Sequence, residues 1–553
     1  MGEQKFALKP LVEAVEHALV EAVDSGEDGD MRVSTPGGVF HVRWDDRGGA
    51  TAMGQLPFFA EYLNATGLFE DWVKGCPLSY VSPNAPRRVD VLGTWMLSIL
   101  DGHHRYAHVG MLRGDGVAPS ILGMKKIIGD DSLRRALSAI APAPDKKHTG
   151  EEKAAQEAQV ERATKWMQSQ LMHSAAEALR TAWVLDCDTT IKPLYGHQAG
   201  AELGYNPHKP GRPSHAIHTY WIGNLRLVLD AQLESDKRHA PSHSRPGLVA
   251  LLEGLAPDSR PQLVRGDVAF GSEGEMAALE ALKQPYLFKL RQSPGVMKLL
   301  NRQWNLDEWV DVGQGWTGRE DTLRLMGWSQ LRRVIVIRRP RKMDIDAQGK
   351  AKVKKRGRKS NVQKQAELAL IDQNEATKNW EYAVLVCDTP YKLENMGQLY
   401  RDRADCRMWQ TRGFDEIKNQ WGWGGYSTHD IERCALSARA VALIYKWWSW
   451  YVRLANPKNR MEAITSRPKL LSAVGRMTSH SGQNKILLTV MHESVDQIKQ
   501  LVANVRSGIR HISAAAPQLV DSQRWVAMVR FIVARILAAQ PKFTPTPAVL
   551  PSG

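Results

Sequence analysis

The stretch Val184-Leu185-Asp186-Cys187-Asp188-Thr189-Thr190 places two carboxylates at the end of a short apolar run. Residues 183–185 are predicted to form a buried strand, because they are apolar and are bounded by polar residues. Side chains alternate along a strand, so Asp186 and Asp188 are expected on one face. Burying such a carboxylate is costly unless it is paired or holds a hard cation such as Mg²⁺. The alternative is a strand that ends in an ordinary turn capped by an aspartate.

A second apolar run, residues 262–266, also ends in a carboxylate, that of Asp267. A third acidic position, Glu416, lies in a stretch with helical spacing, where it can face a sheet edge. If Asp188, Asp267 and Glu416 meet on one sheet, they form a catalytic site that could hold two Mg²⁺ ions and cut phosphodiester bonds. Isolated aspartates at strand ends are common, so the spacing alone also fits acids that have no catalytic role.

The order of the predicted elements indicates an α/β (α+β) catalytic core with additions at both ends and one insertion. Three adjoining strands follow the long predicted helix at 154–181, and the tryptophan-rich helix at 431–452 is expected in the core. The expected regions are a strand pair and helical DNA-binding region (1–150), the first part of the core (151–284), a mainly β insertion with a basic loop at 338–359 (285–392), the last helices of the core (393–460), and a C-terminal helical region and tail (461–553).

The net charge of +15 favours a polyanionic partner such as nucleic acid. Residues 338–359 hold eleven Lys or Arg and two Asp, so this one stretch supplies nine of those charges. Arg105, Lys209 and Arg212 are candidate phosphate contacts, with a solvated surface as the alternative for each. The five cysteines form no CxxC pair, which argues against a zinc ribbon. No apolar window approaches 18 residues, so we expect an intracellular protein without a membrane partner.

Several motifs together resemble the bacterial insertion-sequence transposases of the DDE type, in the branch classed as DDE domain group 1. The resemblance runs from about residue 105 to past residue 468. The stretches that carry it are Asp186-Cys187-Asp188-Thr189-Thr190, Tyr195-Gly196-His197-Gln198, Gly204-Tyr205-Asn206-Pro207, Arg265-Gly266-Asp267, Tyr400-Arg401-Asp402-Arg403-Ala404-Asp405 and residues 414–424.

This resemblance implies an RNase H-like catalytic core that is interrupted before its last helix by a β-rich insertion. It implies two Mg²⁺ ions, which Mn²⁺ could replace, and Asp188 and Asp267 as the first two catalytic acids and metal ligands. Its implied partners are double-stranded DNA, both terminal inverted repeats and target, and a second copy of the chain in the synaptic complex. It also implies a cytoplasmic, nucleoid-associated location. Tyr400, Arg403 and Lys418 would contact DNA near the cut.

The third acid departs from the family pattern Tyr-x-x-Arg-x-x-x-Glu. Tyr400 and Arg403 match the pattern, but Arg407 occupies the position of the Glu. Either Glu416 takes the role through a shifted helix register, or this copy has lost its third ligand and is impaired. Three functions therefore stay open: a transposase that cleaves and transfers strands, a copy that only binds DNA, and an RNase H-like nuclease that cuts without joining.

Overall fold

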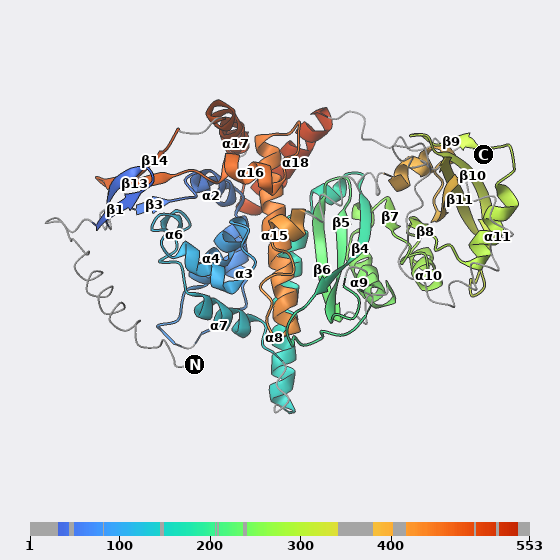
Figure 1. Cartoon of the computed structure of the whole chain (residues 1–553), viewed down its shortest axis with the longest axis horizontal. Helices are drawn as coiled ribbons and strands as arrows, with labels where there is room; N and C mark the ends of the chain where they lie inside the picture. The colour runs from blue at the N-terminus through green and yellow to red at the C-terminus, as the bar shows by residue number, and fades with distance from the viewer. Residues whose placement is uncertain are drawn as a thin grey trace, which may run out of the picture.

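The protein is described here by a computed structural model. It describes residues 31–43, 49–80, 82–143, 149–204, 206, 209–235, 241–340, 380–401, 416–490, 494–515 and 519–539. In Figure 1 a long helix, α15 (Ile431–Ala455), runs through the middle of the molecule. N-terminal helices lie on one side of it and a large sheet on the other. Residues 1–30, and the basic loop expected at 338–359 from residue 341 onward, lie outside the described residues.

The large sheet has nine strands in the order β6-β5-β4-β7-β8-β12-β11-β10-β9. Its first part consists of β4 (Val184–Pro193), β5 (Ser214–Ile222), β6 (Leu227–Ser235), β7 (Leu263–Gly266) and β8 (Tyr286–Lys289). β4, β5 and β6 form an antiparallel meander, whereas β7 and β8 are added parallel to β4. Three antiparallel strands followed by two parallel ones make up the RNase H-like arrangement that the sequence resemblance implies.

The inserted strands continue this same sheet. They are β9 (Val310–Asp311), β10 (Thr317–Leu323), β11 (Arg332–Pro340) and β12 (Trp380–Asp388). All of them pair antiparallel, and β12 joins the core at β8. The described part of this region also includes a helix, α11 (Pro294–Gln303). Although β8 falls within the stretch expected to be inserted, its parallel pairing with β7 makes it part of the core sheet.

Helices cover both faces of the meander. On one face, the Tyr220 hydroxyl donates to the carbonyl of Ser244 in α9 (Pro241–Glu253), at 2.9 Å. On the other, the Trp221 ring contacts Tyr445 of α15, with ring centroids 6.2 Å apart. The remaining helices of this part are α8 (Glu151–His173) and α10 (Glu273–Ala281).

The tryptophans of α15 are core residues, as expected. Trp447, Trp448 and Trp450 are each 0–1% exposed. Trp447 contacts Trp72 edge-on at 5.6 Å, which joins α15 to the N-terminal helices. These helices are α2 (Leu56–Thr66), α3 (Leu68–Gly75), α4 (Arg88–Leu100), α5 (Val109–Leu112), α6 (Ala118–Ile121) and α7 (Asp130–Ile140). Even α15 is not apolar enough for a bilayer, and none of the described helices meets the requirements for a membrane span.

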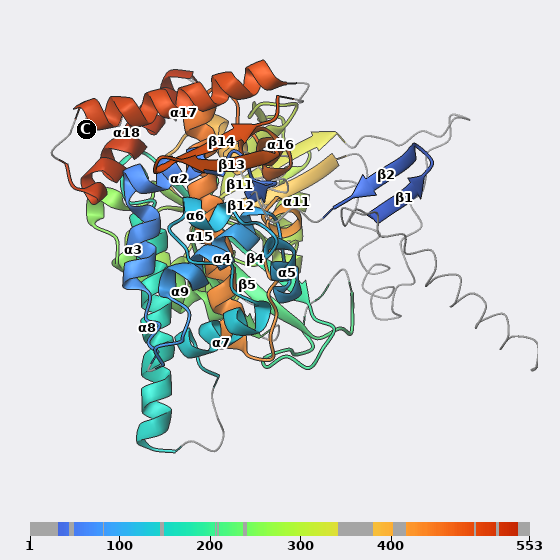
Figure 2. The same ribbon diagram turned by 90° about the vertical axis from the view of Figure 1, so that its left-hand side faces the viewer.

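The two expected N-terminal strands are present as a hairpin, β1 (Met31–Thr35) and β2 (Gly38–Val42), which stands away from the body in Figure 2. The C-terminal region, in contrast, is not wholly helical. Between α16 (Ala463–Leu470) and α17 (Val495–Ala515) lies a second hairpin, β13 (Gly475–His480) and β14 (Gln483–Leu488). The last helix is α18 (Asp521–Ala539).

Turn chemistry explains why part of the expected C-terminal helical region forms this hairpin. Ser481 and Gly482 both have positive φ, at 51° and 75°, as a tight two-residue hairpin requires. The hairpin also gains a third strand from far away in the sequence, β3 (Gly49–Thr51), which pairs with β13. Such a non-local partner leaves no local pattern in the sequence.

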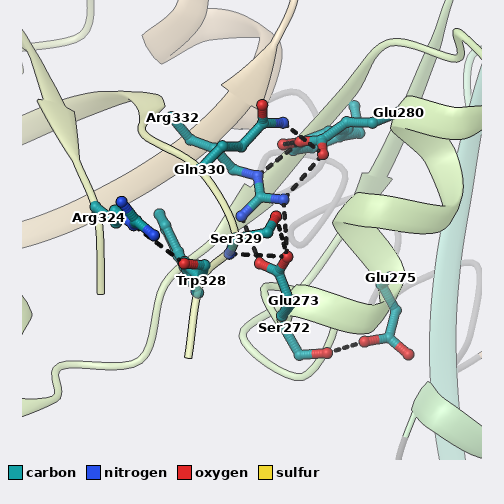
Figure 3. Close-up of polar contacts among 10 residues, drawn as sticks. Ser272, Glu273, Glu275, Glu280, Arg324, Trp328, Ser329, Gln330 and Arg332 are labelled. Atoms are coloured by element: carbon teal, nitrogen blue, oxygen red, sulfur yellow. Dashed lines mark hydrogen bonds and ion pairs between the residues drawn. The ribbon is translucent and has the colours of Figure 1, made fainter. Parts of the chain in front are cut away.

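A cluster of ion pairs fastens the insertion to the core (Figure 3). Arg332 at the start of β11 is 2% exposed in its side chain and donates to two glutamates of α10. Its Nε lies 2.6 Å from Glu280, and its Nη1 lies 2.5 Å from Glu273. The Ser329 hydroxyl also donates to Glu273, at 2.6 Å. The hydrogen bond from Arg332, together with those from Ser329, lowers the pKa of Glu273 to about 2.

Replacing Arg332 with Met should lower the free energy of unfolding by about 2–4 kcal/mol, because two carboxylates lose their buried partner. The loss should also shrink at low pH. The depressed pKa of Glu273 contributes stability above its unfolded pKa, and this contribution disappears as pH falls toward about 2. Urea unfolding of both proteins near neutral pH and at acidic pH measures the difference.

Arg302→Met provides the control, since Arg302 also pairs with a carboxylate of the insertion, Asp321, but is 63% exposed. Exposed pairs contribute about 0–1 kcal/mol, so this variant should be nearly as stable as the wild type. Equal stability of both variants at all pH values would contradict a role for Arg332 in holding the insertion.

Candidate active site

A buried ion pair joins the two central parallel strands. β4 continues to Pro193, so Asp188 lies within the strand and not at its end, where the apolar run at 183–185 predicted it. Arg265 of β7 donates to both carboxylate oxygens of Asp186 on β4, at 2.7 and 2.8 Å. The two side chains are 4% and 2% exposed. Arg265 also donates to the carbonyl of Leu399, at 2.6 Å, in the helical stretch at 393–401. Asp186 is therefore paired with a positive charge. Through Arg265, the pair links β4, β7 and the helical stretch at 393–401.

The strand register indicates where the two predicted catalytic aspartates lie. β4 and β7 run parallel, and Asp186 stands opposite Arg265. Asp188 follows Asp186 by two residues within β4, and Asp267 follows Arg265 by two residues, one position past Gly266, the last residue of β7. If the alternation of side chains continues past Gly266, both aspartates would follow the Asp186–Arg265 pair on the same face. Neighbouring strands are about 4.8 Å apart, so the register favours two carboxylates close enough to share an ion.

Local geometry holds each aspartate in place. Both are half-buried. The Asp188 carboxylate accepts from the backbone N–H of Thr189, at 2.8 Å, and that of Asp267 accepts from the N–H of Ala269, at 2.9 Å. Gly266 precedes the second acid for a steric reason, since a Cβ there would lie 2.6 Å from the Cβ of Phe270. The turn after β7 can therefore fold tightly against the sheet.

Two adjacent carboxylates fit a divalent cation. Mg²⁺ is commonly bound through one or two carboxylates and completes its shell with water and substrate phosphates. In the described part of the chain, no group of three or more His, Cys, Asp and Glu side chains is placed to hold a metal ion. Asp188 and Asp267 thus remain the candidate ligands, without a third side chain beside them among these residues.

Glu416 is engaged elsewhere. It is 3% exposed and begins a short π-helix, Glu416–Gln420. Its carboxylate accepts from the Arg460 guanidinium and, at 3.0 Å, from the backbone N–H of Ala463 at the start of α16. The indole N–H of Trp421 is 3.4 Å away. These contacts fit an acid that anchors α16 better than a metal ligand.

The motif around Tyr400 is only partly described. Tyr400 is half-buried and packs against an apolar cluster of the inserted strands and core strands. Arg403 and Arg407, which are central to the family pattern, lie outside the described residues. The contact of Tyr400 with DNA stays a prediction, and its packing accounts for the side chain in the protein alone.

Lys209 and Arg212 come together on one aromatic ring. Their charged groups lie over Tyr195, at 4.8 and 4.6 Å from the ring centroid. All three side chains are exposed. The hydrogen bond that Lys209 donates to the Tyr195 hydroxyl, and the charges of both cations, lower the pKa of that phenol. The arrangement is a compact, exposed pair of cations with a fixed spacing.

Lys418 lies near a cation that the sequence analysis did not single out. Burial and the charge of Lys418 lower the pKa of Lys192, which is on β4. Lys192 is four residues after Asp188 and hence on its side of the strand. Arg105 is exposed, on the loop before Tyr106–His108. The spacing of four residues between Asp188 and Lys192, which puts both on one face of a strand, was the sequence signal that could have identified Lys192.

Residues 179–445 match the family model of the transposase DDE domain. This range begins just before β4, contains Asp188 and Asp267, and ends within α15. Residues 179–445 are therefore a transposase DDE domain. Enzymes of this family typically use divalent metal ions, in keeping with the adjacent carboxylates.

A search of curated proteins finds no match to this transposase. Among solved structures, the chain is similar to a piggyBac transposase in a synaptic complex with hairpin DNA. The two are 11% identical, and the match covers 90% of this chain and 89% of the other, with a TM-score of 0.37. A likeness at that score carries no argument, so the family membership comes from the sequence match.

Replacing Glu416 with Gln should lower the free energy of unfolding by about 2–3 kcal/mol, because Arg460 loses a charged partner in a buried site. Thermal or urea unfolding measures this, with Glu394→Gln, an exposed acid, as the control. A variant that keeps full stability but loses DNA cleavage would instead make Glu416 a metal ligand.

Proposed function

We propose that this transposase binds the terminal inverted repeats of a bacterial insertion sequence, cuts the element end and joins it to target DNA. Two copies would act together in the synaptic complex. The observation that supports the catalytic assignment is the register of β4 and β7 within the DDE domain, in which Asp188 and Asp267 each come two residues after the paired Asp186 and Arg265.

Asp188 and Asp267 would hold Mg²⁺, up to two ions with Mn²⁺ as a substitute, through their carboxylate oxygens. Bound metal supplies activation of the attacking oxygen and stabilisation of the leaving oxygen in phosphodiester chemistry. The chain itself fixes the two carboxylates by strand pairing and by the backbone donors of Thr189 and Ala269. It thereby limits how the scissile phosphate can approach. Water would cut the first strand, and the freed 3′ hydroxyl would attack target DNA.

Cations around this strand end would hold the DNA backbone. Lys209 and Arg212 offer two exposed charges on Tyr195. Lys418, Arg105, Tyr400 and Arg403 are further proposed contacts. Contacts of this kind position a duplex without reading its sequence, so recognition of the terminal repeats needs additional residues.

A second function is a copy that grips element ends without cutting them. Two observations favour it: Arg407 stands where the family pattern has Glu, and Glu416 is paired with Arg460. An RNase H-like nuclease that does not join ends is a further outcome of the same assays.

Replacing Asp267 with Asn should reduce metal-dependent cleavage of a terminal-repeat duplex by about 100-fold or more, because a neutral amide holds a divalent cation weakly. DNA binding should persist within a few fold. Cleavage and strand joining on gels, together with fluorescence anisotropy for binding, separate the two effects.

Asp258→Asn, at an exposed position outside the sheet, is the matched control and should cut normally. Full activity of Asp267→Asn would show the catalytic assignment to be wrong. A wild-type chain that binds repeat ends but never cuts them, with either Mg²⁺ or Mn²⁺, would establish the binding-only copy.

Replacing both Lys209 and Arg212 with Gln should weaken DNA binding equally for all sequences. The slope of log K against log salt should become less steep by about 1 for each lost phosphate contact. The control is Lys153→Gln with Lys165→Gln, which removes two exposed cations from α8. A slope that changes equally in both double variants would mean that net charge alone matters.

A further inference from the structure

Three histidines cluster on the loop that follows α4. His103 is the buried one, and both of its ring nitrogens have partners: the Ser98 hydroxyl at 3.2 Å and the Asp101 carboxylate at 3.1 Å. The Ser98 hydroxyl is in turn 2.8 Å from that of Tyr426. His103 is thus an anchor that fixes the loop to the core.

The other two imidazoles extend from this anchor. His104 is exposed and His108 is half-buried. Their rings meet edge-on with centroids 4.8 Å apart, and His108 also meets His103 at 5.3 Å. Arg105, between them in the sequence, is exposed. This loop therefore presents two imidazoles and one guanidinium side by side.

A glycine-rich turn connects the histidine loop to the catalytic strand. The backbone N–H of Tyr426 donates to the carbonyl of His104, at 2.7 Å. Gly422 packs so closely that a Cβ there would lie 2.5 Å from the His104 Cβ. On the other side, a Cβ at Gly424 would lie 3.1 Å from the Cδ of Lys192. The turn thus lies between His104 and Lys192 of β4, and its glycines pack against both side chains.

The charges near these imidazoles are mostly positive. Burial lowers the pKa of His104, and His108, Arg105 and Lys192 lower it further. Burial, His103 and Arg105 likewise lower the pKa of His108. From α7, Arg134 lies over the neighbouring Tyr106 ring, at 4.8 Å.

The acid at the C-terminal end of α4 is already paired. Asp101 pairs with His103. Across the described residues, no ion pair joins His104, Arg105, His108 or Lys192 to a carboxylate. Gathering like charges without a counter-charge costs free energy, and an anion that binds among them removes this cost.

We propose that His104, Arg105, His108 and Lys192 form a binding patch for DNA backbone phosphates, and that the two imidazoles take up protons when DNA binds. The proposal rests on the function proposed above and adds a site and a pH response to it. Lys192 follows Asp188 by four residues, which is roughly 13 Å along a strand. The patch would then hold the duplex about four base-pair steps from the phosphate that is cut.

The direction of the pH response follows from charge. A neighbouring phosphate favours the imidazolium form and raises the pKa of each imidazole in the complex above its depressed value in the free protein. Between those two pKa values, binding takes up protons, so affinity must rise as pH falls. At pH values above both, the imidazoles are neutral and contribute little.

The test is the affinity of the full chain for a short fluorescent duplex of arbitrary sequence, at constant ionic strength, from about pH 8 to about pH 5.5. We expect wild-type affinity to rise as pH falls, by up to about tenfold per pH unit for each full proton taken up. His104→Gln with His108→Gln should match the wild type near pH 8 and lose most of this rise. Lys192→Gln should raise the pKa of His104, because it removes a neighbouring positive charge. NMR titration of labelled imidazoles measures this pKa.

His243→Gln with His480→Gln is the matched control, because both histidines are exposed and lie on α9 and β13. That variant should keep the wild-type pH response, and unfolding midpoints should agree among all variants. Wild-type affinity that is independent of pH, or a full response in His104→Gln with His108→Gln, overturns the patch. A chain that binds no duplex at any pH overturns the proposed function itself, and the patch with it.

Discussion

The buried pair of Asp186 and Arg265 is the interaction on which the catalytic face depends. Two charged groups at 2% and 4% exposure are tolerated because both carboxylate oxygens receive a guanidinium donor. The pair joins β4 and β7 in a register in which Asp188 and Asp267 each follow it by two residues. A slip of one residue would turn one aspartate to the opposite face of the sheet. The same ion pair therefore bears on both the packing of these two strands and the proposed placement of the two aspartates.

Much of this arrangement could be predicted from local pattern. The meander of β4, β5 and β6 and the strand that ends before Asp267 follow from apolar runs bounded by turn residues. The two aspartates stand out because carboxylates at strand ends are costly to bury. Arg265 carried no such signal, since an arginine beside an apolar run is usually solvent-exposed. Only the strand pairing reveals that it faces Asp186.

Other features depend on contacts far apart in the sequence. The insertion was expected to be mainly β, but nothing local indicated that β12 would pair with β8 and extend the core sheet. β13 and β14 were missed because β3, more than 400 residues earlier in the chain, completes their sheet. The role of Glu416 could not be inferred either, because its partner Arg460 is 44 residues away. Helical spacing predicts which side of the helix an acid such as Glu416 occupies. It does not predict which residues pack against that side.

The two outer strands of the nine-stranded sheet differ in how they end it. β9 has two residues, Val310 and Asp311, which is too short to template another strand. At the opposite side, Asp230 of β6 is held by Gln168 of α8 and by Arg439 of α15. The short β9 therefore disfavours lateral growth at its margin, and the helices α8 and α15 pack against β6 at the other. A second chain is therefore not expected to add its strands beside β9 and build a fibre from this sheet.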